Sequence, residues 1–360
     1  MLLIDRGSTL HLRSDDESLQ WSFDAGGRFL QGHTDEVHLQ LGVSGTLLER
    51  RGPRGRHKRR PVAHPPERAL PLLTALCKRL ATLDLQGDAA QLERLRSWTP
   101  ARYAAHAARY AQVYRPVPIL PPDCYQAVVA QVTEGCSHNA CRFCTLYANV
   151  PFRVKPPHEL ETHLASVREL LGPSLALRRS VFLGDANALL IPRDRILAAM
   201  ERVREALPDQ AAGGFYSFVD AFTPPGRTVD ELKDLAAAGL RRAYVGLETG
   251  NAPLLEALGK PATPHGAAQL VHRLHAAGVS AGVIALVGPG GAAAEDDHVR
   301  DTVAAVRAME LGPSDIVYLS PLIPSELSPE RLDAQEDRLR QGLSDLACKV
   351  ATYDLTRWVY

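Results

Sequence analysis

The feature that most constrains the fold is a regular alternation of apolar runs and amphipathic stretches from residue 127 onward. The apolar runs have the length and the β-branched content of strands that are buried on both faces. They lie at 127–133, 180–184, 213–220, 243–248, 282–288 and 315–320. The stretches between them repeat apolar residues at the spacing of a helix. This alternation predicts a parallel sheet covered by helices.

Six strand–helix units predict an α/β fold, specifically a partial (β/α)6 TIM-like barrel. A long terminal helix is expected at about 329–349, where the sequence is again amphipathic. A doubly wound open sheet is the alternative, because it is built from the same alternating elements.

The first 120 residues have a different pattern. Leu19, Trp21 and Phe23 alternate with polar residues, as in a half-buried strand, and the pattern of 67–114 is helical. We therefore expect a small α+β accessory region at 1–120, a barrel at 121–326 and a helical segment at 327–360.

Overall charge gives no sign of a nucleic-acid or membrane partner. Lys plus Arg and Asp plus Glu number 41 each, so no net field attracts the chain to either surface. No apolar run reaches the roughly 18 residues that a spanning helix needs. The first residues also lack a basic region followed by an apolar stretch, so no signal peptide is expected. The expected compartment is the cytoplasm.

One local exception is a basic segment at 50–60, inside a stretch rich in Pro and Gly. Its seven Lys and Arg residues could contact RNA phosphates. A solvated linker is the favoured interpretation, because no aromatic side chains are interleaved to stack on bases. A nucleic-acid partner is thus open but unsupported.

Three of the six cysteines, Cys136, Cys141 and Cys144, form a C-x4-C-x2-C motif directly after the first predicted barrel strand. Chemistry in such barrels is placed at the carboxyl ends of strands, so the location favours a functional role. Clustered cysteines in an intracellular enzyme indicate a metal or catalysis. The scattered cysteines, which we expect to be small buried apolar residues, are Cys77, Cys124 and Cys348.

Three thiolates on one loop can hold a single small metal centre. Iron–sulfur clusters are held by such ligands, normally four of them, so one iron would remain open here. Zinc is the competing interpretation, but structural zinc uses four closed ligands and no second Cys pair is present. His138 could be a fourth ligand only in a strained arrangement, inside the loop. An iron–sulfur cluster is therefore favoured.

These residues resemble the radical S-adenosylmethionine (SAM) enzymes, which carry C-x3-C-x-Φ-C with an aromatic Φ. Phe143 occupies the Φ position, whereas the first gap is one residue longer than in that motif. The resemblance implies a [4Fe-4S] cluster whose fourth iron is chelated by SAM. It also implies an external electron donor such as flavodoxin or ferredoxin. One electron would cleave SAM to a 5′-deoxyadenosyl radical, which abstracts hydrogen from a substrate that the sequence leaves unknown.

The resemblance implies SAM contacts at later strand ends as well. Gly184 and Asp185 follow the second strand, and Glu248 lies in a GLETG segment similar to one of that family. On the third strand the polar candidates are Ser217 and Asp220, which the alternation of a strand sends to opposite faces, and Ser217 is preferred. For Asp185 a turn or helix-capping role is an equal alternative, and for Glu248 the alternative is an Arg partner at the barrel rim.

A function of another class also remains. The cysteine loop could hold zinc or an iron–sulfur cluster in a regulatory or RNA-binding protein that does not cleave SAM. The basic segment at 50–60 motivates this alternative.

Overall fold

A computed structural model of the chain describes residues 1–14, 19–33, 36–52, 61–223 and 226–360. The chain forms two compact units. The N-terminal unit comprises Met1–Leu120 together with His163–Arg179 and Leu355–Tyr360. The barrel unit comprises Pro121–Thr162 and Ser180–Asp354. Most of the basic segment that could contact RNA, residues 53–60, lies outside the described residues.

The N-terminal unit is built on a seven-stranded antiparallel sheet in which each strand pairs with the next along the chain. The expected alternation around Trp21 is confirmed, because Trp21 and Phe23 are buried on one face of β3. The strands are β1 Leu2–Asp5, β2 Thr9–Arg13, β3 Gln20–Asp24, β4 Phe29–His33, β5 Val37–Leu41, β6 Leu47–Arg51 and β7 Val62–His64.

Three helices follow the sheet along the chain in this unit: α1 Pro66–Thr82, α2 Ala89–Arg96 and α3 Pro100–Val113. The hydroxyl of Thr99 accepts the Arg102 N–H at 3.3 Å and caps α3, which begins with a proline at its first turn. Leucines of α1 share one buried core with the inward side chains of the sheet. The expected α+β character of this region is confirmed.

The barrel unit contains a parallel sheet with the strand order β16-β15-β14-β13-β12-β11-β8. All six predicted strands are present: β8 Ala127–Gln131, β11 Ser180–Gly184, β12 Phe215–Val219, β13 Leu240–Glu248, β14 Ser280–Val287 and β15 Ile316–Pro321. The seventh, β16 Lys349–Thr352, was not expected. The terminal helix α11 is Pro329–Gly342, so the helix predicted to continue to about 349 ends earlier and a strand follows.

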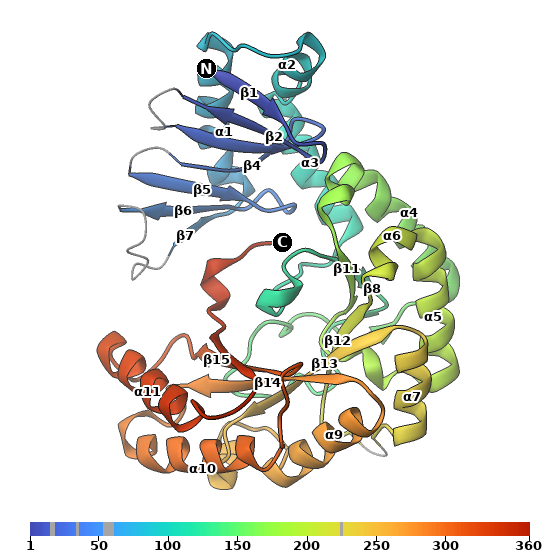
Figure 1. Cartoon of the computed structure of the whole chain (residues 1–360), viewed down its shortest axis with the longest axis vertical. Coiled ribbons are helices and arrows are strands. Elements are labelled where there is room, and N and C mark those ends of the chain that lie inside the picture. Colours follow the sequence, from blue (N-terminus) through green and yellow to red (C-terminus); the bar gives the residue numbers. More distant parts are fainter. Residues whose placement is uncertain (15–18, 34–35, 53–60, 224–225) are drawn as a thin grey trace. The chain divides into compact units, whose positions relative to one another are not determined.

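The strand order decides between the two folds that the sequence left open. Each strand lies beside its predecessor in the chain, without the reversal of a doubly wound sheet. Within the described residues β8 and β16 are the two edges, so this is a partial barrel. Figure 1 shows helices along its outer side. They include α5 Arg193–Ala206, α6 Pro208–Ala212, α7 Val229–Ala237, α9 Pro264–Ala276 and α10 Glu295–Arg307. Two further helices are α8 Ala252–Ala257, which follows β13, and α4 Pro157–Leu171, whose residues from His163 onward belong to the N-terminal unit.

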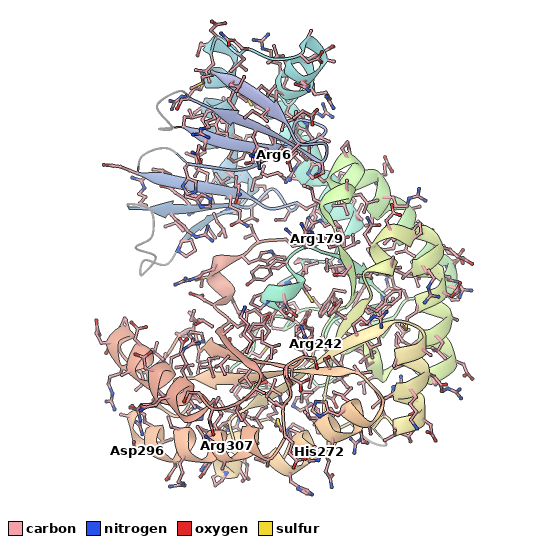
Figure 2. The ribbon with its side chains drawn as sticks, in the orientation of Figure 1. Arg6, Arg179, Arg242, His272, Asp296 and Arg307 are labelled. Carbon is pink, nitrogen blue, oxygen red and sulfur yellow. The ribbon has the colours of Figure 1, made fainter. Side chains whose placement is uncertain are left out.

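A set of hydrogen-bonded side chains lies at the amino ends of the strands. Asp123, just before β8, accepts the hydroxyls of Tyr244 and Tyr318 at 2.6 and 2.7 Å. Arg242, labelled in Figure 2, also pairs with Asp123. Because parallel strands all run the same way, their carboxyl ends lie at the opposite edge of the sheet, where the cysteine motif follows β8.

No helix in the described parts of the chain combines the length and apolarity needed to cross a membrane.

Candidate functional site

The cysteine loop is held at its base by a short hairpin. β9 Thr133–Glu134 pairs antiparallel with β10 Arg153–Val154, so the chain returns to where the loop began. Glu134 accepts hydrogen bonds from Arg153 at 2.8 and 3.0 Å and also pairs with Lys155. Burial alone would raise the pKa of Glu134, but these two cations lower it to about 2. This ion cluster fixes the two ends of the loop together.

Two left-handed residues shape the loop itself. Gly135 has φ 75°, and a Cβ there would lie 2.5 Å from the Val150 carbonyl oxygen, so the position requires glycine. Asn139 has φ 43°, a conformation that asparagine adopts more readily than most residues. Its N–H points to Cys136 Sγ at 3.4 Å, and its side chain donates to the Tyr147 carbonyl at 2.8 Å. The long gap between Cys136 and Cys141 is therefore a turn centred on Asn139.

Cys136, Cys141 and Cys144 are free, half-buried thiols. They are close enough that Cys136 helps to raise the pKa of the other two, although burial is the larger cause; the pKa of Cys141 rises to about 11. Within the described residues, no three His, Cys, Asp or Glu side chains converge on one metal ion. An iron–sulfur cluster does not require the three thiolates to meet at one metal ion, because each thiolate binds a different iron. The donor set thus fits an iron–sulfur cluster.

The outer side of the loop is attached to the segment after α8. The Arg142 N–H donates to the Leu258 carbonyl at 2.9 Å, and His138 Nε2 lies 3.0 Å from the Gly259 carbonyl oxygen. His138 is therefore engaged by backbone. Phe143 packs against a small apolar group that contains Leu254, Leu258 and Leu286. These contacts set the position of the loop relative to the ends of β13 and β14.

Asp185 joins the end of β11 to the start of the loop. It is 4% exposed and accepts from Gln131 Nε2 at 2.8 Å and from the Gly135 N–H at 3.0 Å. Its neighbour Gly184 accepts from the Thr133 hydroxyl at 3.0 Å. Burial is the main influence on the Asp185 carboxyl and raises its pKa to about 6, against the lowering effect of the two donors. Asp185 thus bonds to β8 and the loop, not to the following helix.

The raised pKa of Asp185 predicts a pH-dependent stability. The folded chain holds this proton more tightly than the unfolded chain, so the stability that the proton contributes is lost as the pH rises from about 4 through about 6. A difference of about two pKa units corresponds to about 3 kcal/mol. The metal-free chain and its Asp185→Asn variant should be compared at pH 4 and pH 7. The free energy of unfolding of the unmodified chain should fall relative to that of the variant by about that amount as the pH rises from 4 to 7. Urea titrations at both pH values would measure it, and a difference independent of pH would contradict it.

The end of β12 brings Asp220, and not Ser217, to the loop. Ser217 is fully buried and its hydroxyl donates to the Leu183 carbonyl at 2.9 Å. By the alternation of the strand it faces away from the Phe218 ring, which packs against Phe182 and Tyr244. Asp220 accepts from the Asn187 side chain, which also lies 3.4 Å from the Ser137 hydroxyl.

Glu248 ends β13 in a left-handed conformation, with φ 62°. Its carboxylate pairs with Lys260 Nζ at 2.6 Å, and both side chains are only about one-tenth exposed. Lys260 also donates to the Gly246 carbonyl at 2.6 Å, and a Cβ on Gly246 would collide with both charged groups. The glycine of the GLETG segment thus makes room for this pair. The partner of Glu248 is therefore a lysine, where an Arg of the rim was the alternative considered.

The remaining residues of GLETG attach the end of β13 to α10. The Thr249 hydroxyl bonds to Nδ1 of the fully buried His298 at 2.8 Å, and the Gly250 N–H donates to the Thr302 hydroxyl at 2.9 Å. A Cβ on Gly250 would overlap the backbone of Asp301. The segment therefore has a structural role in addition to presenting Glu248.

Sequence reasoning missed two members of the site, Lys260 and Gln131. Lys260 follows Glu248 by twelve residues and lies in a loop, so no periodic pattern marks the two as partners. Gln131 does have a signal, because it is the one amide in the apolar strand β8 and a buried amide needs a hydrogen-bonding partner.

The sequence pattern of the Radical SAM superfamily matches residues 130–303, from the end of β8 into α10. Curated proteins give no match. Among solved structures, the radical SAM methyltransferase TsrM from Kitasatospora setae, with cobalamin and a [4Fe-4S] cluster bound, is 23% identical with a TM-score of 0.38. That match covers 54% of this chain and 36% of TsrM, so this chain spans about a third of its length.

Two other structures are more distant in sequence. Methylornithine synthase (PylB) is 15% identical, with 77% of this chain and 80% of that chain covered and a TM-score of 0.43. SuiB from Streptococcus suis is 13% identical, with 89% and 71% covered and a TM-score of 0.44. These likenesses carry no inference about substrate.

The superfamily match rests on the segment that holds the three cysteines, the Asp185 contacts and the Glu248–Lys260 pair. The cofactors of this superfamily are a [4Fe-4S] cluster and SAM, and the three thiols on one loop fit that cluster. Just under half of the chain, residues 130–303, thus matches the radical SAM superfamily.

Proposed function

We propose that the barrel unit is a radical SAM enzyme that cleaves SAM reductively and abstracts hydrogen from a substrate. Cys136, Cys141 and Cys144 would hold the cluster, and three protein ligands would leave one iron available to SAM. A cluster held there would supply the single electron that cleaves SAM to methionine and a 5′-deoxyadenosyl radical. The observation that carries the proposal is the placement of three free thiols on one loop at the carboxyl ends of parallel strands.

The SAM contacts are proposed for four residues around this loop. Glu248 and Asp185 are buried carboxylates that can accept from the SAM ammonium, and each lies beside the loop. Gly184 lets the ligand approach the backbone. Phe143 offers an apolar edge next to Cys144. Ser217 is not included, because it is fully buried and its hydroxyl donates to the Leu183 carbonyl on the strand face that points away from the loop.

Lys260 is an additional residue for this site. Burial raises the pKa of Cys141 and Cys144, and the charge of the Lys260 ammonium lowers it. Lys260 therefore lies close to the proposed cluster ligands. A cation there opposes the negative charge of thiolates and can pair with the SAM carboxylate. We propose that Lys260 and Glu248 act together, one toward the carboxylate and the other toward the ammonium of SAM.

The substrate and the electron donor are further parts of the proposal. Flavodoxin or ferredoxin is the class of donor that fits a one-electron reduction. The substrate is an organic molecule with an abstractable hydrogen, and its identity stays open.

An anaerobic reconstitution tests the proposal directly. We expect about four irons and four sulfides per chain, as in the clusters that three or four thiolates hold. Reduction with dithionite in the presence of SAM should then release 5′-deoxyadenosine. One bound zinc per chain, without SAM binding or 5′-deoxyadenosine release, would instead support the regulatory or RNA-binding alternative.

A further inference from the structure

The N-terminal unit contains a hollow that the proposed radical chemistry does not use. Its volume is about 280 Å³, near the lower end of the range for small-molecule sites. It is lined by the turn after β3, by α3 and by residues 169–173, all within the N-terminal unit. These segments are far apart in the sequence, so the fold brings them together.

Three guanidinium groups line this hollow. Arg102 is exposed on α3 and stacks over the Trp98 ring, with its Cζ 4.4 Å from the ring centroid. Arg109, two turns further along α3, pairs with Glu169 at 2.9 Å. Arg28 is the third and is only 3% exposed. Three arginines around one hollow favour the binding of carboxylate or phosphate oxygens.

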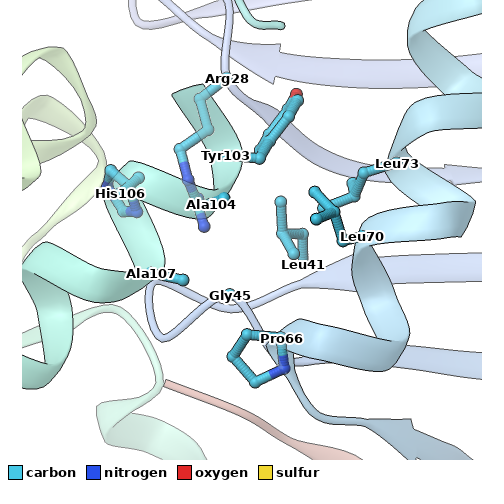
Figure 3. Close-up of a pocket in the computed structure, with 10 residues that line it drawn as sticks. All are labelled: Arg28, Leu41, Gly45, Pro66, Leu70, Leu73, Tyr103, Ala104, His106 and Ala107. Carbon is cyan, nitrogen blue, oxygen red and sulfur yellow. The ribbon is translucent and has the colours of Figure 1, made fainter. Parts of the chain in front are cut away.

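Arg28 is the most unusual of the three. Its guanidinium bonds to the Gly42 carbonyl, but its Nε is buried without a hydrogen-bond partner among the described residues. Figure 3 shows its side chain reaching between His106 and Tyr103 beside a second, smaller hollow of about 20 Å³. A buried donor without an acceptor is destabilising by about 1–3 kcal/mol, more when it is charged. Other atoms of Arg28 line the larger hollow, so its positive charge lies beside any ligand bound there.

Arg109 is already paired with Glu169, so Arg28 and Arg102 are the two guanidinium groups that the hollow offers to a ligand. Asp24 is 2% exposed, and its oxygens accept the Arg28 N–H at 2.9 Å and the Ser174 hydroxyl. Burial, followed by the charge of Arg28, lowers the pKa of His106 to about 3, so this ring is neutral near pH 7. Glu169 is taken by Arg109 at the rim. The remaining walls include apolar side chains of Leu170, Leu171 and Pro173.

We propose that this hollow binds a small organic anion, a carboxylate or phosphate attached to a flat apolar body. The guanidinium groups of Arg28 and Arg102 hold the anionic oxygens, and the apolar walls beside Trp98 hold the body. The ligand is a regulator or a substrate fragment recognised apart from the barrel. The site depends on no step of the proposed radical reaction.

Isothermal titration of the reconstituted full-length chain tests the site with three probes: benzoate, phenyl phosphate and the neutral benzamide. We expect at least one of the two anions to bind with one site per chain, and benzamide to bind at least ten-fold more weakly. Arg102→Gln should raise the Kd of the bound anion about ten-fold, equal to about 1.4 kcal/mol. Arg109→Gln should weaken binding in the same direction.

Arg96→Gln is the matched control, because Arg96 is exposed on α2 in the same unit and does not line the hollow. It removes the same charge and should leave the Kd unchanged. Binding of benzoate alone or of phenyl phosphate alone supports the site and identifies its anion. Absence of binding by both anions, equal binding of benzamide, or an Arg96→Gln effect as large as that of Arg102→Gln would overturn the proposal.

Discussion

Replacing Cys141 by alanine should leave the chain almost without iron. Each of the three thiolates is expected to bind one iron, and no other cysteine follows on the loop to take over its role. A cluster held by two protein ligands is not expected to persist, so the iron content after anaerobic reconstitution should fall from about four per chain to well below one. Iron and sulfide assays, together with electron paramagnetic resonance of the reduced chain, would measure the loss. SAM cleavage should disappear with it.

Cys348→Ala provides the matched control for the cluster. Cys348 is 7% exposed in the barrel unit and lies just before β16, away from the loop in sequence. The substitution removes a buried thiol of the same kind, so a modest loss of stability is expected while the iron content stays at the level of the unmodified chain. Retention of four irons by Cys141→Ala, or equal loss of iron in both variants, would refute the assignment of the loop.

The arrangement of the barrel could be predicted because its signals are local. Strands buried on both faces are continuous apolar runs, and the six predicted strands are present in the structure. A barrel strand and the loop after it are also adjacent in sequence, so the cysteine motif could be assigned to the functional edge of the sheet. The strand β16 gave no such signal, because its four residues, Lys349–Thr352, include only one large apolar side chain.

Contacts between distant residues could not be predicted in the same way. The choice between Ser217 and Asp220 depends on which face of β12 meets the barrel interior, and the packing of Phe218 decides this. The partner of Glu248 was considered as an arginine, whereas Lys260 reaches it from the loop after α8. The hollow around Arg28 combines three separate segments, so nothing in the sequence pattern indicates it.

Breaking the Glu248–Lys260 pair from one side should strongly destabilise the barrel unit. Both side chains are about one-tenth exposed, and the pair is 2.6 Å apart. Lys260→Met leaves the carboxylate buried without its cation, which is typically destabilising by about 3–5 kcal/mol. Glu248→Gln leaves the buried ammonium with neutral oxygen acceptors only, the Gly246 carbonyl and the new side-chain amide, and with no carboxylate to balance its charge. Urea denaturation of the metal-free chain would give both values.

The double variant separates loss of the pair from loss of a charge. Glu248→Gln/Lys260→Met removes both buried charges, so it should be less destabilised than the sum of the single variants by about 2 kcal/mol or more. The exposed pair Lys233–Asp230, 3.5 Å apart on α7, is the matched comparison, and Lys233→Met should change the free energy of unfolding by less than about 1 kcal/mol. In the reconstituted chain, SAM binding should weaken in both Lys260→Met and Glu248→Gln. If the single variants were additive and SAM affinity were unchanged, the pair would be neither a stabilising contact nor part of the SAM site.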